Sequence, residues 1–239
     1  MTFETLRALA DRAALFTALR QDQLTAATDE LGEHRWDVDL DAGTFTFASH
    51  EDPARTLVAT PHLLASIAPG PRSVMWSWAL PQGDPTGITD RLRRYGEDHG
   101  ISELTQGEVA FPDDAGDDLE EWIVALAHTI GAAAVEITGL SPYYAAQAGG
   151  ATAVLLLDAP LHPLTVASAV SALPRMLWDI DLSDPRASVW DLARLAGWRL
   201  EWADDAFSAA TLTDATGSAT FAFDEYARIT DVKDTLTGA

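Results

Sequence analysis

The chain has 239 residues, with 37 acidic and 15 basic side chains that give a formal net charge of −22. This length fits one large domain or two small ones, and a hydrophobic content of 47% with eight Trp is typical of a globular protein. The charge repels nucleic acid and anionic membranes and attracts basic partners, and the absence of Cys excludes disulfides, thiolate metal sites and a cysteine nucleophile.

The N-terminus and the longest apolar runs predict a soluble cytoplasmic protein. Residues 1–16 carry a charge every few positions, unlike the apolar centre of a signal peptide. Uninterrupted apolar runs such as 152–157 are too short to span a bilayer. The chain has no Asn and a single lysine, Lys233, which is typical of a GC-rich genome and accounts for part of the acidity.

The first segments change from helical to strand periodicity. Apolar side chains recur at helical spacing over 3–28 and predict a helix. Residues 35–40 and 44–47 alternate polar and apolar side chains around a turn, which predicts a hairpin. Residues 55–67 predict another strand, in which Pro61 marks an edge or a bulge.

A Trp-rich segment and a helix follow. Residues 73–80 predict a strand that carries Trp76 and Trp78 on one face. Such a pair either packs in the core or lines a ligand groove or an interface. The next segment predicts a helix over 87–99 that ends at Gly100.

The middle of the chain predicts a loop over 112–116 and then a helix over 117–131. Its first turn is acidic, as the helix macrodipole favours. Apolar runs at 133–139 and 151–158 predict two strands.

After residue 159 the pattern starts again. Residues 165–177 and 188–196 predict two helices. Four short alternating segments then predict an antiparallel meander, at 198–202, 207–213, 218–223 and 226–232.

These elements together predict an α+β fold in which antiparallel meanders pack against helices. We expect one domain over 1–158 and a smaller unit over 159–239. Each would be a helix followed by a meander, so a duplication that gave two similar halves is a further hypothesis.

Four sets of strings between residues 30 and 147 carry a family likeness. They are 35–40 with 43–47, 75–79, 92–101 with 104–105, and 131–133 with 142–144. They resemble an uncharacterised bacterial family, a domain of unknown function. That family follows its Trp strand with Asn-Pro, whereas this chain has Leu80-Pro81. The resemblance implies an α+β domain and no activity.

The sequence contains no recognisable motif for a catalytic site, a metal or a cofactor. The six His are scattered, and no two have the spacing of the helical zinc motif. The paired acids in 113–118 lack the alternating ligands of a calcium loop. Ser141 precedes a proline, where a nucleophile elbow would turn into a helix. We therefore expect no cofactor, and a binding protein more readily than an enzyme.

The acidic residues are unevenly distributed. From Tyr95 to Pro174 there are eighty residues with twelve acids and no Lys or Arg. The acids concentrate between Glu97 and Glu121, beside an arginine triplet at 91, 93 and 94. The candidate binding residues are Trp76, Trp78, Arg94, Glu97, Asp113, Asp114, Asp117, Asp118, Glu120 and Glu121.

These features favour a non-enzymatic module that binds a basic protein. It would resemble an inhibitor or immunity protein of a cationic enzyme, or a chaperone. One alternative is a small-molecule-binding protein or enzyme with a pocket near the Trp76 and Trp78 strand. Another is that the acidity serves only solubility. Neither nucleic acid nor a membrane is an expected partner, and the oligomeric state stays open.

Overall fold

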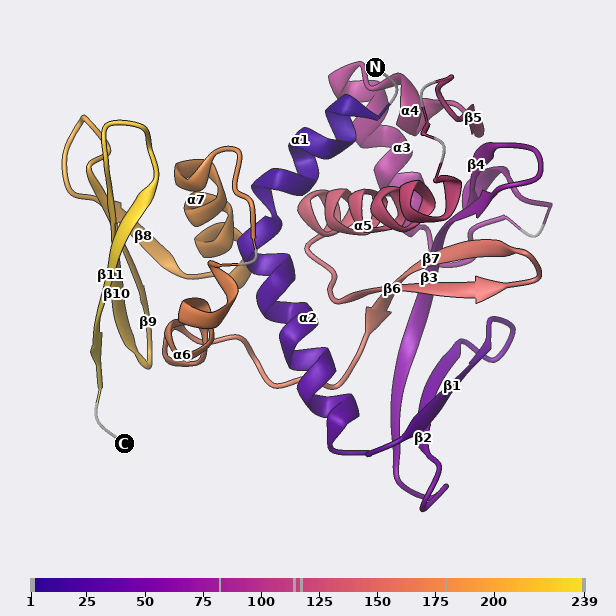
Figure 1. Ribbon diagram of the computed structural model, residues 1–239, viewed down its shortest axis with the longest axis horizontal. Coiled ribbons are helices and arrows are strands. Elements are labelled where there is room, and N and C mark those ends of the chain that lie inside the picture. Colours follow the sequence, from indigo (N-terminus) through magenta and orange to yellow (C-terminus); the bar gives the residue numbers. More distant parts are fainter. Residues whose placement is uncertain (1–2, 82, 114, 117, 179, 238–239) are drawn as a thin grey trace. The chain divides into compact units, whose positions relative to one another are not determined.

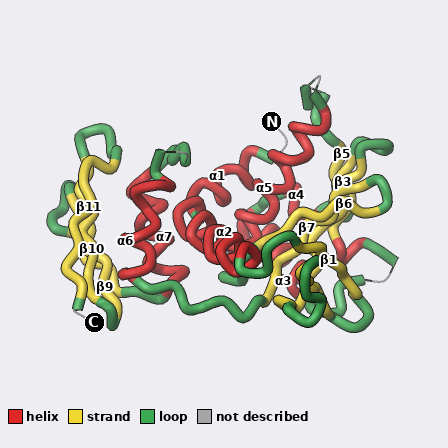
Figure 2. Tube along the Cα trace, turned by 60° about the horizontal axis from the view of Figure 1, so that its bottom comes forward, coloured by secondary structure: helices red, strands yellow, loops and turns green. Residues whose placement is uncertain are grey.

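The computed structural model describes residues 3–81, 83–113, 115–116, 118–178 and 180–237, and its helices and antiparallel sheets form an α+β fold (Figure 1). The chain divides into two compact units. Unit 1 comprises residues 1–10 and 24–160, and unit 2 comprises residues 11–23 and 161–239. Each unit has its own sheet (Figure 2).

The helices and strands follow one another along the chain. They are α1 (Glu4–Arg12), α2 (Ala14–Asp29), β1 (His34–Asp39), β2 (Thr44–Ser49), β3 (Thr56–Ala68), β4 (Ser73–Trp76), the 3-10 helix η1 (Ser77–Ala79), α3 (Ile88–His99), α4 (Ser102–Thr105), β5 (Glu108–Ala110), α5 (Leu119–Thr138), β6 (Tyr143–Ala148), β7 (Ala151–Asp158), α6 (Val166–Met176), α7 (Pro185–Ala196), β8 (Arg199–Trp202), β9 (Ala209–Asp214), β10 (Gly217–Phe223) and β11 (Ile229–Leu236).

The sheet of unit 1 is built around the long strand β3. Its strands follow the order β1-β2-β3-β4-β5, while β7 pairs with both β3 and β6, and every pair is antiparallel. Helix α5 packs against β6 and β7. An aromatic cluster joins the β1–β2 hairpin to β6, because Trp36, Phe45 and Phe47 all contact the ring of Tyr144. The predicted hairpin is confirmed.

The sheet of unit 2 is the meander that the sequence predicts. Its four strands follow the order β11-β10-β9-β8 with antiparallel pairing throughout. Helix α6 packs against β9, β10 and β11, and α7 packs against β8. Leu212, Ala219 and Phe221 lie in the core of this unit.

The helix predicted over 3–28 is divided into α1 and α2 at Ala13. The chain passes from unit 1 to unit 2 at residues 10 and 11. Periodicity shows which side chains are buried, but not which unit buries them. Both helices bury apolar side chains at helical spacing, so the sequence pattern does not show the break between them.

The strand predicted over 133–139 is wrong, because α5 continues to Thr138. Every residue from 130 to 136 is buried, so the segment lacks the polar face that distinguishes a helix. By length and composition alone α5 could also cross a membrane. However, 56% of its apolar window is buried, as in the core helix of a globular protein.

The strand predicted over 73–80 is too long. Strand β4 ends at Trp76, and Trp78 lies in η1, so the two indoles do not share a strand face. Trp76 is opposite Ala65 of β3, and the register of β3 shifts between Leu63 and Ala65. Beyond Trp76 the neighbouring strand is therefore irregular, and the pairing stops.

Candidate functional site

Trp76 belongs to the core of unit 1. It is only 1% exposed, and its indole Nε1 donates a hydrogen bond to the backbone carbonyl of Glu103 at 2.7 Å. A buried indole whose donor is satisfied contributes packing and leaves no group for a ligand.

Trp78 is half-buried beneath an arginine. The guanidinium carbon of Arg93 lies 5.3 Å from the centre of the indole ring, within the range of a cation–π contact. The same guanidinium group lies 3.5 Å from the Asp90 carboxylate and 3.9 Å from that of Glu97. These contacts hold Arg93 over the Trp78 ring.

The three arginines of α3 make different contacts. Arg91 donates a hydrogen bond to the carbonyl of Thr138 at the end of α5, at 3.1 Å. Arg93 covers Trp78, whereas Arg94 is exposed and has no ion pair within the described residues. The triplet therefore does not converge on one point, as an anion site would require.

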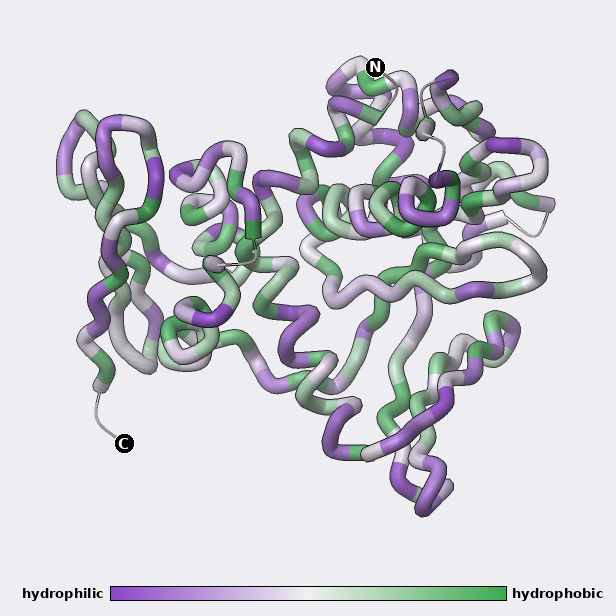
Figure 3. Tube along the Cα trace, in the orientation of Figure 1, coloured by the Kyte–Doolittle hydropathy of each residue, from purple (hydrophilic) through white to green (hydrophobic). Residues whose placement is uncertain are grey.

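The candidate acids that the structure describes are exposed. Asp98, which follows Glu97 in the sequence, is exposed as well. We call these carboxylates together the acidic surface: Glu97, Asp98, Asp113, Asp118, Glu120 and Glu121. Asp114 and Asp117 lie outside the described residues. Figure 3 shows hydrophilic residues where α5 begins.

Core contacts hold the elements of the acidic surface together. Gly96 of α3 packs closely on α4, because a Cβ at Gly96 would lie 2.6 Å from that of Leu104. The Phe3 amide donates to the Glu103 carboxylate of α4 at 3.1 Å, and the Phe3 ring lies 6.3 Å from that of Trp122 in α5. The end of α3, α4 and the first turns of α5 are therefore packed around shared neighbours (Figure 1).

Little positive charge neutralises this surface. Asp118 caps α5 by accepting a hydrogen bond from the backbone amide of Glu121 at 3.0 Å, and Glu120 and Glu121 lie in the first turn, where the macrodipole stabilises them. Glu97 has Arg93 at 3.9 Å. Within the described residues no salt bridge involves the other exposed carboxylates, those of Asp98, Asp113, Glu120 and Glu121.

The structure also brings together His128 and Tyr143, a pair that the sequence does not indicate. His128 Nδ1 lies 2.7 Å from the Tyr143 hydroxyl. Burial raises the pKa of Tyr143 to about 12 and lowers the pKa of His128. The pair is therefore a neutral hydrogen bond between α5 and β6 at physiological pH.

His62 on β3 is a second titratable group in a polar surrounding. Burial lowers its pKa, against the opposing effects of Asp158 and Asp84, and its buried Nδ1 atom has no hydrogen-bond partner among the described residues. In the part of the chain that the structure describes, no group of three or more His, Asp or Glu residues is arranged to hold a metal ion.

Two cavities lie away from the candidate residues. One of about 300 Å³ is lined by Thr44 where β2 begins, Thr60 in β3 and Asp158 where β7 ends. The other, of about 350 Å³, lies in unit 2 between α6 and β11. Neither Trp76 nor Trp78 lines either cavity.

The fold and the site define an α+β protein with an exposed acidic surface in unit 1 that has little compensating positive charge. The chain belongs to a family of unknown function (DUF6882), whose model matches residues 7–160. The match confirms the resemblance to an uncharacterised domain and extends it over all but the first residues of unit 1. No curated protein and no solved structure matches the chain.

Proposed function

We propose that the protein is a non-enzymatic binding module that holds a basic protein against the acidic surface. The observation that carries this proposal is the set of exposed carboxylates between Glu97 and Glu121 that have almost no cationic neighbours. A field of one sign accelerates encounter with an oppositely charged partner and disfavours partners of like charge.

The form of the partner separates two versions of this function. An inhibitor or immunity protein would bind a folded cationic enzyme and block its activity. A chaperone would bind a cationic segment that is not yet folded. We place this activity in a bacterial cytoplasm, and the lack of Cys, together with an amino-acid usage without Asn and with a single Lys, supports that setting.

The contacts around the two indoles do not favour the small-molecule alternative. Trp76 is buried with its donor satisfied, and Arg93 covers Trp78. The solubility alternative predicts no partner at all, so one experiment separates it from the proposal.

The test is capture of partners from the native host lysate on the immobilised full chain, at low and at high salt. We expect a basic protein that binds at low salt and dissociates near 1 M, where the Debye length falls to about 3 Å. The matched variant replaces Asp98, Asp113, Glu120 and Glu121 with their amides. It should lose most of the captured partner.

The control neutralises four exposed acids elsewhere in unit 1, namely Asp29, Asp37, Asp41 and Glu51. The control changes the net charge by the same amount as the acidic-surface variant, so it should retain the partner if the acidic surface is the binding site. If both variants lose the captured partner equally, then the net charge of the protein holds the partner and the acidic surface is not a specific site. Absence of any partner at either salt would favour solubility alone.

A further inference from the structure

Strand β11 (Ile229–Leu236) forms one edge of the sheet of unit 2. It pairs with β10, and within the described residues no other strand pairs with it. The opposite edge strand, β8, has four residues, whereas β11 has eight. A long edge strand presents a row of unpaired backbone groups to a further strand.

Two hydrogen bonds establish which backbone groups of β11 face outward. The amide of Phe223 donates to the carbonyl of Ser208 before β9 at 2.8 Å, and the amide of Thr237 donates to the carbonyl of Thr216 at 3.0 Å. Because backbone groups alternate sides along a strand, both bonds place the groups of Asp231 and Lys233 toward β10. The N–H and C=O of Val232 therefore point away from the sheet.

This alternation allows two copies to pair antiparallel along β11, and the central charges favour one register. Outward groups must meet outward groups, so a two-fold axis at Val232 pairs that residue with itself. Asp231 then lies opposite Lys233 of the other copy, and the same pair recurs on the other side of the axis. Moving the axis by one residue would place Asp231 against Asp231 or Lys233 against Lys233, which is unfavourable.

Charged side chains on an edge strand usually prevent pairing with another chain. Here the two central charges have opposite signs, so the pairing about Val232 converts them into two ion pairs. Lys233 is also the only lysine among the 239 residues. In the single chain it lies 3.2 Å from Asp231, with both side chains exposed and available to a second copy.

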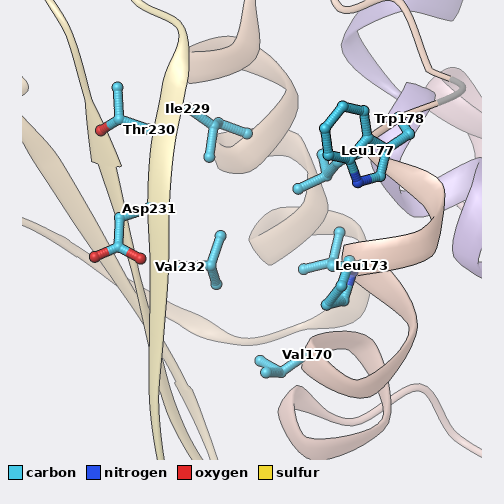
Figure 4. Close-up of a pocket in the computed structure, with 9 residues that line it drawn as sticks. Val170, Leu173, Leu177, Trp178, Ile229, Thr230, Asp231 and Val232 are labelled. Atoms are coloured by element: carbon cyan, nitrogen blue, oxygen red, sulfur yellow. The ribbon is translucent and has the colours of Figure 1, made fainter.

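The inner face of this edge has a groove that a further strand would cover. Val232 and Ile229 point toward Leu173 of α6 and Leu177 at its C-terminal cap across the cavity of about 350 Å³, while Asp231 points away (Figure 4). Trp178 lines the same cavity and is 90% exposed. The side chain of the second Val232 would lie on this inner face, because paired residues project to the same side.

We propose that β11 is a homodimerisation edge. Two copies pair antiparallel about Val232, form reciprocal Asp231–Lys233 ion pairs on the outer face, and join their two four-stranded sheets into one. The inference is independent of the acidic surface, which lies in unit 1. An interface of one strand and one groove is small, so we expect a dissociation constant in the micromolar range or weaker.

The first test uses charge reversal in the full chain, measured by sedimentation over a concentration series. The wild type should dimerise. Lys233→Glu and Asp231→Lys should each weaken the dimer by about tenfold or more, since both ion pairs become like-charge pairs. The 1:1 mixture of these two variants should recover a heterodimer, because every cross-strand pair is then opposite in sign.

The second test addresses the backbone. Val232→Pro removes an N–H that faces outward and donates to no strand of its own chain, so it should abolish the dimer with little change in circular dichroism. Thr211→Val on the outer face of β9 provides a control that should leave the dimer intact. A wild type that is monomeric throughout, or a dimer that survives both Val232→Pro and Lys233→Glu, would overturn the proposal.

Discussion

At the scale of single residues, the contact between Gly131 and Tyr143 explains a glycine within a helix. A Cβ added at Gly131 would lie 2.4 Å from the Tyr143 ring, closer than any real contact. The glycine lets α5 approach β6 closely enough for His128 to reach the Tyr143 hydroxyl. A glycine in mid-helix normally reduces stability, so this close approach is the physical reason for its presence here.

Gly131→Ala is expected to lower the free energy of unfolding by about 1–3 kcal/mol, because the added methyl overpacks the site. In an exposed helix the same change would stabilise by nearly 1 kcal/mol. The measurement is urea unfolding of the full chain. In a Tyr143→Ala background the substitution should become neutral or stabilising, and a stabilising effect in the wild type would contradict this account.

The sequence identified some of these residues correctly and could not identify others. Asp118 at the start of α5 follows from local rules, because a helix N-terminus needs an acceptor within its first turn. The His128–Tyr143 bond and the position of Arg93 over Trp78 connect residues that are 15 apart in the chain. Such contacts depend on how elements pack, which local patterns do not encode.

At the scale of elements, α3 begins with a capping network centred on Asp84. Its Oδ1 atom accepts hydrogen bonds from the amide and hydroxyl of Thr86, and its Oδ2 atom accepts from those of Thr89, at 2.6–3.0 Å. The N-cap residue itself, Gly87, has no side chain for this role. Asp84 therefore satisfies donors at the start of a helix that carries Arg93 and Glu97.

Asp84→Ala should lower stability by about 1–2 kcal/mol at neutral pH, as expected for loss of a cap. Burial opposes ionisation of Asp84, but the bonds from Thr86 and Thr89 outweigh it and lower its pKa. The carboxylate therefore stabilises the fold above the unfolded pKa of about 3.9, and this contribution is lost as the pH falls through the lower folded value.

Thermal unfolding of wild type and variant across pH checks this expectation. The difference in melting temperature should be largest near pH 7 and shrink on acidification. Asp98→Ala, at the other end of α3, should show little difference at any pH, because within the described residues Asp98 makes no side-chain hydrogen bond or ion pair. A difference that stays constant with pH would assign the effect of Asp84 to packing instead.

Element prediction failed where burial was complete or where strands were very short. The bounds of α3 follow from its amphipathic pattern and from Gly100. The last turns of α5 are buried on every side, so their pattern also fits a buried strand. Strand β5 has three residues and helix α4 has four, too few for any periodicity to emerge.

At the scale of the whole molecule, the two units are interleaved in sequence. Residues 11–23 belong with residues 161–239, although they lie inside a segment whose other parts belong to unit 1. Arg12 lies 2.8 Å from the fully buried carboxylate of Asp191, and Arg175 lies 2.5 Å from Asp22. Partners so distant in sequence cannot be paired by reading one helical pattern, so the sequence places 11–23 in the first domain together with the rest of the N-terminal segment.

This interleaving makes a prediction about the segment that the family model matches. A fragment of residues 1–160 retains 11–23 but lacks the remainder of unit 2, so Leu15, Phe16 and Leu19 lose the unit to which they belong. Exposing each such side chain costs about 1.5–3 kcal/mol. We therefore expect the fragment to bind a hydrophobic dye and to unfold at a lower temperature than the full chain.

Replacing Leu15, Phe16 and Leu19 with Gln in the same fragment provides the matched control. Gln keeps the helix propensity high but removes the apolar surface, so dye binding should fall while the melt of unit 1 is retained. The same three substitutions in the full chain should instead destabilise unit 2, because these positions are buried there. If the unsubstituted fragment neither binds dye nor melts earlier, residues 11–23 do not need residues 161–239, which would contradict their place in unit 2.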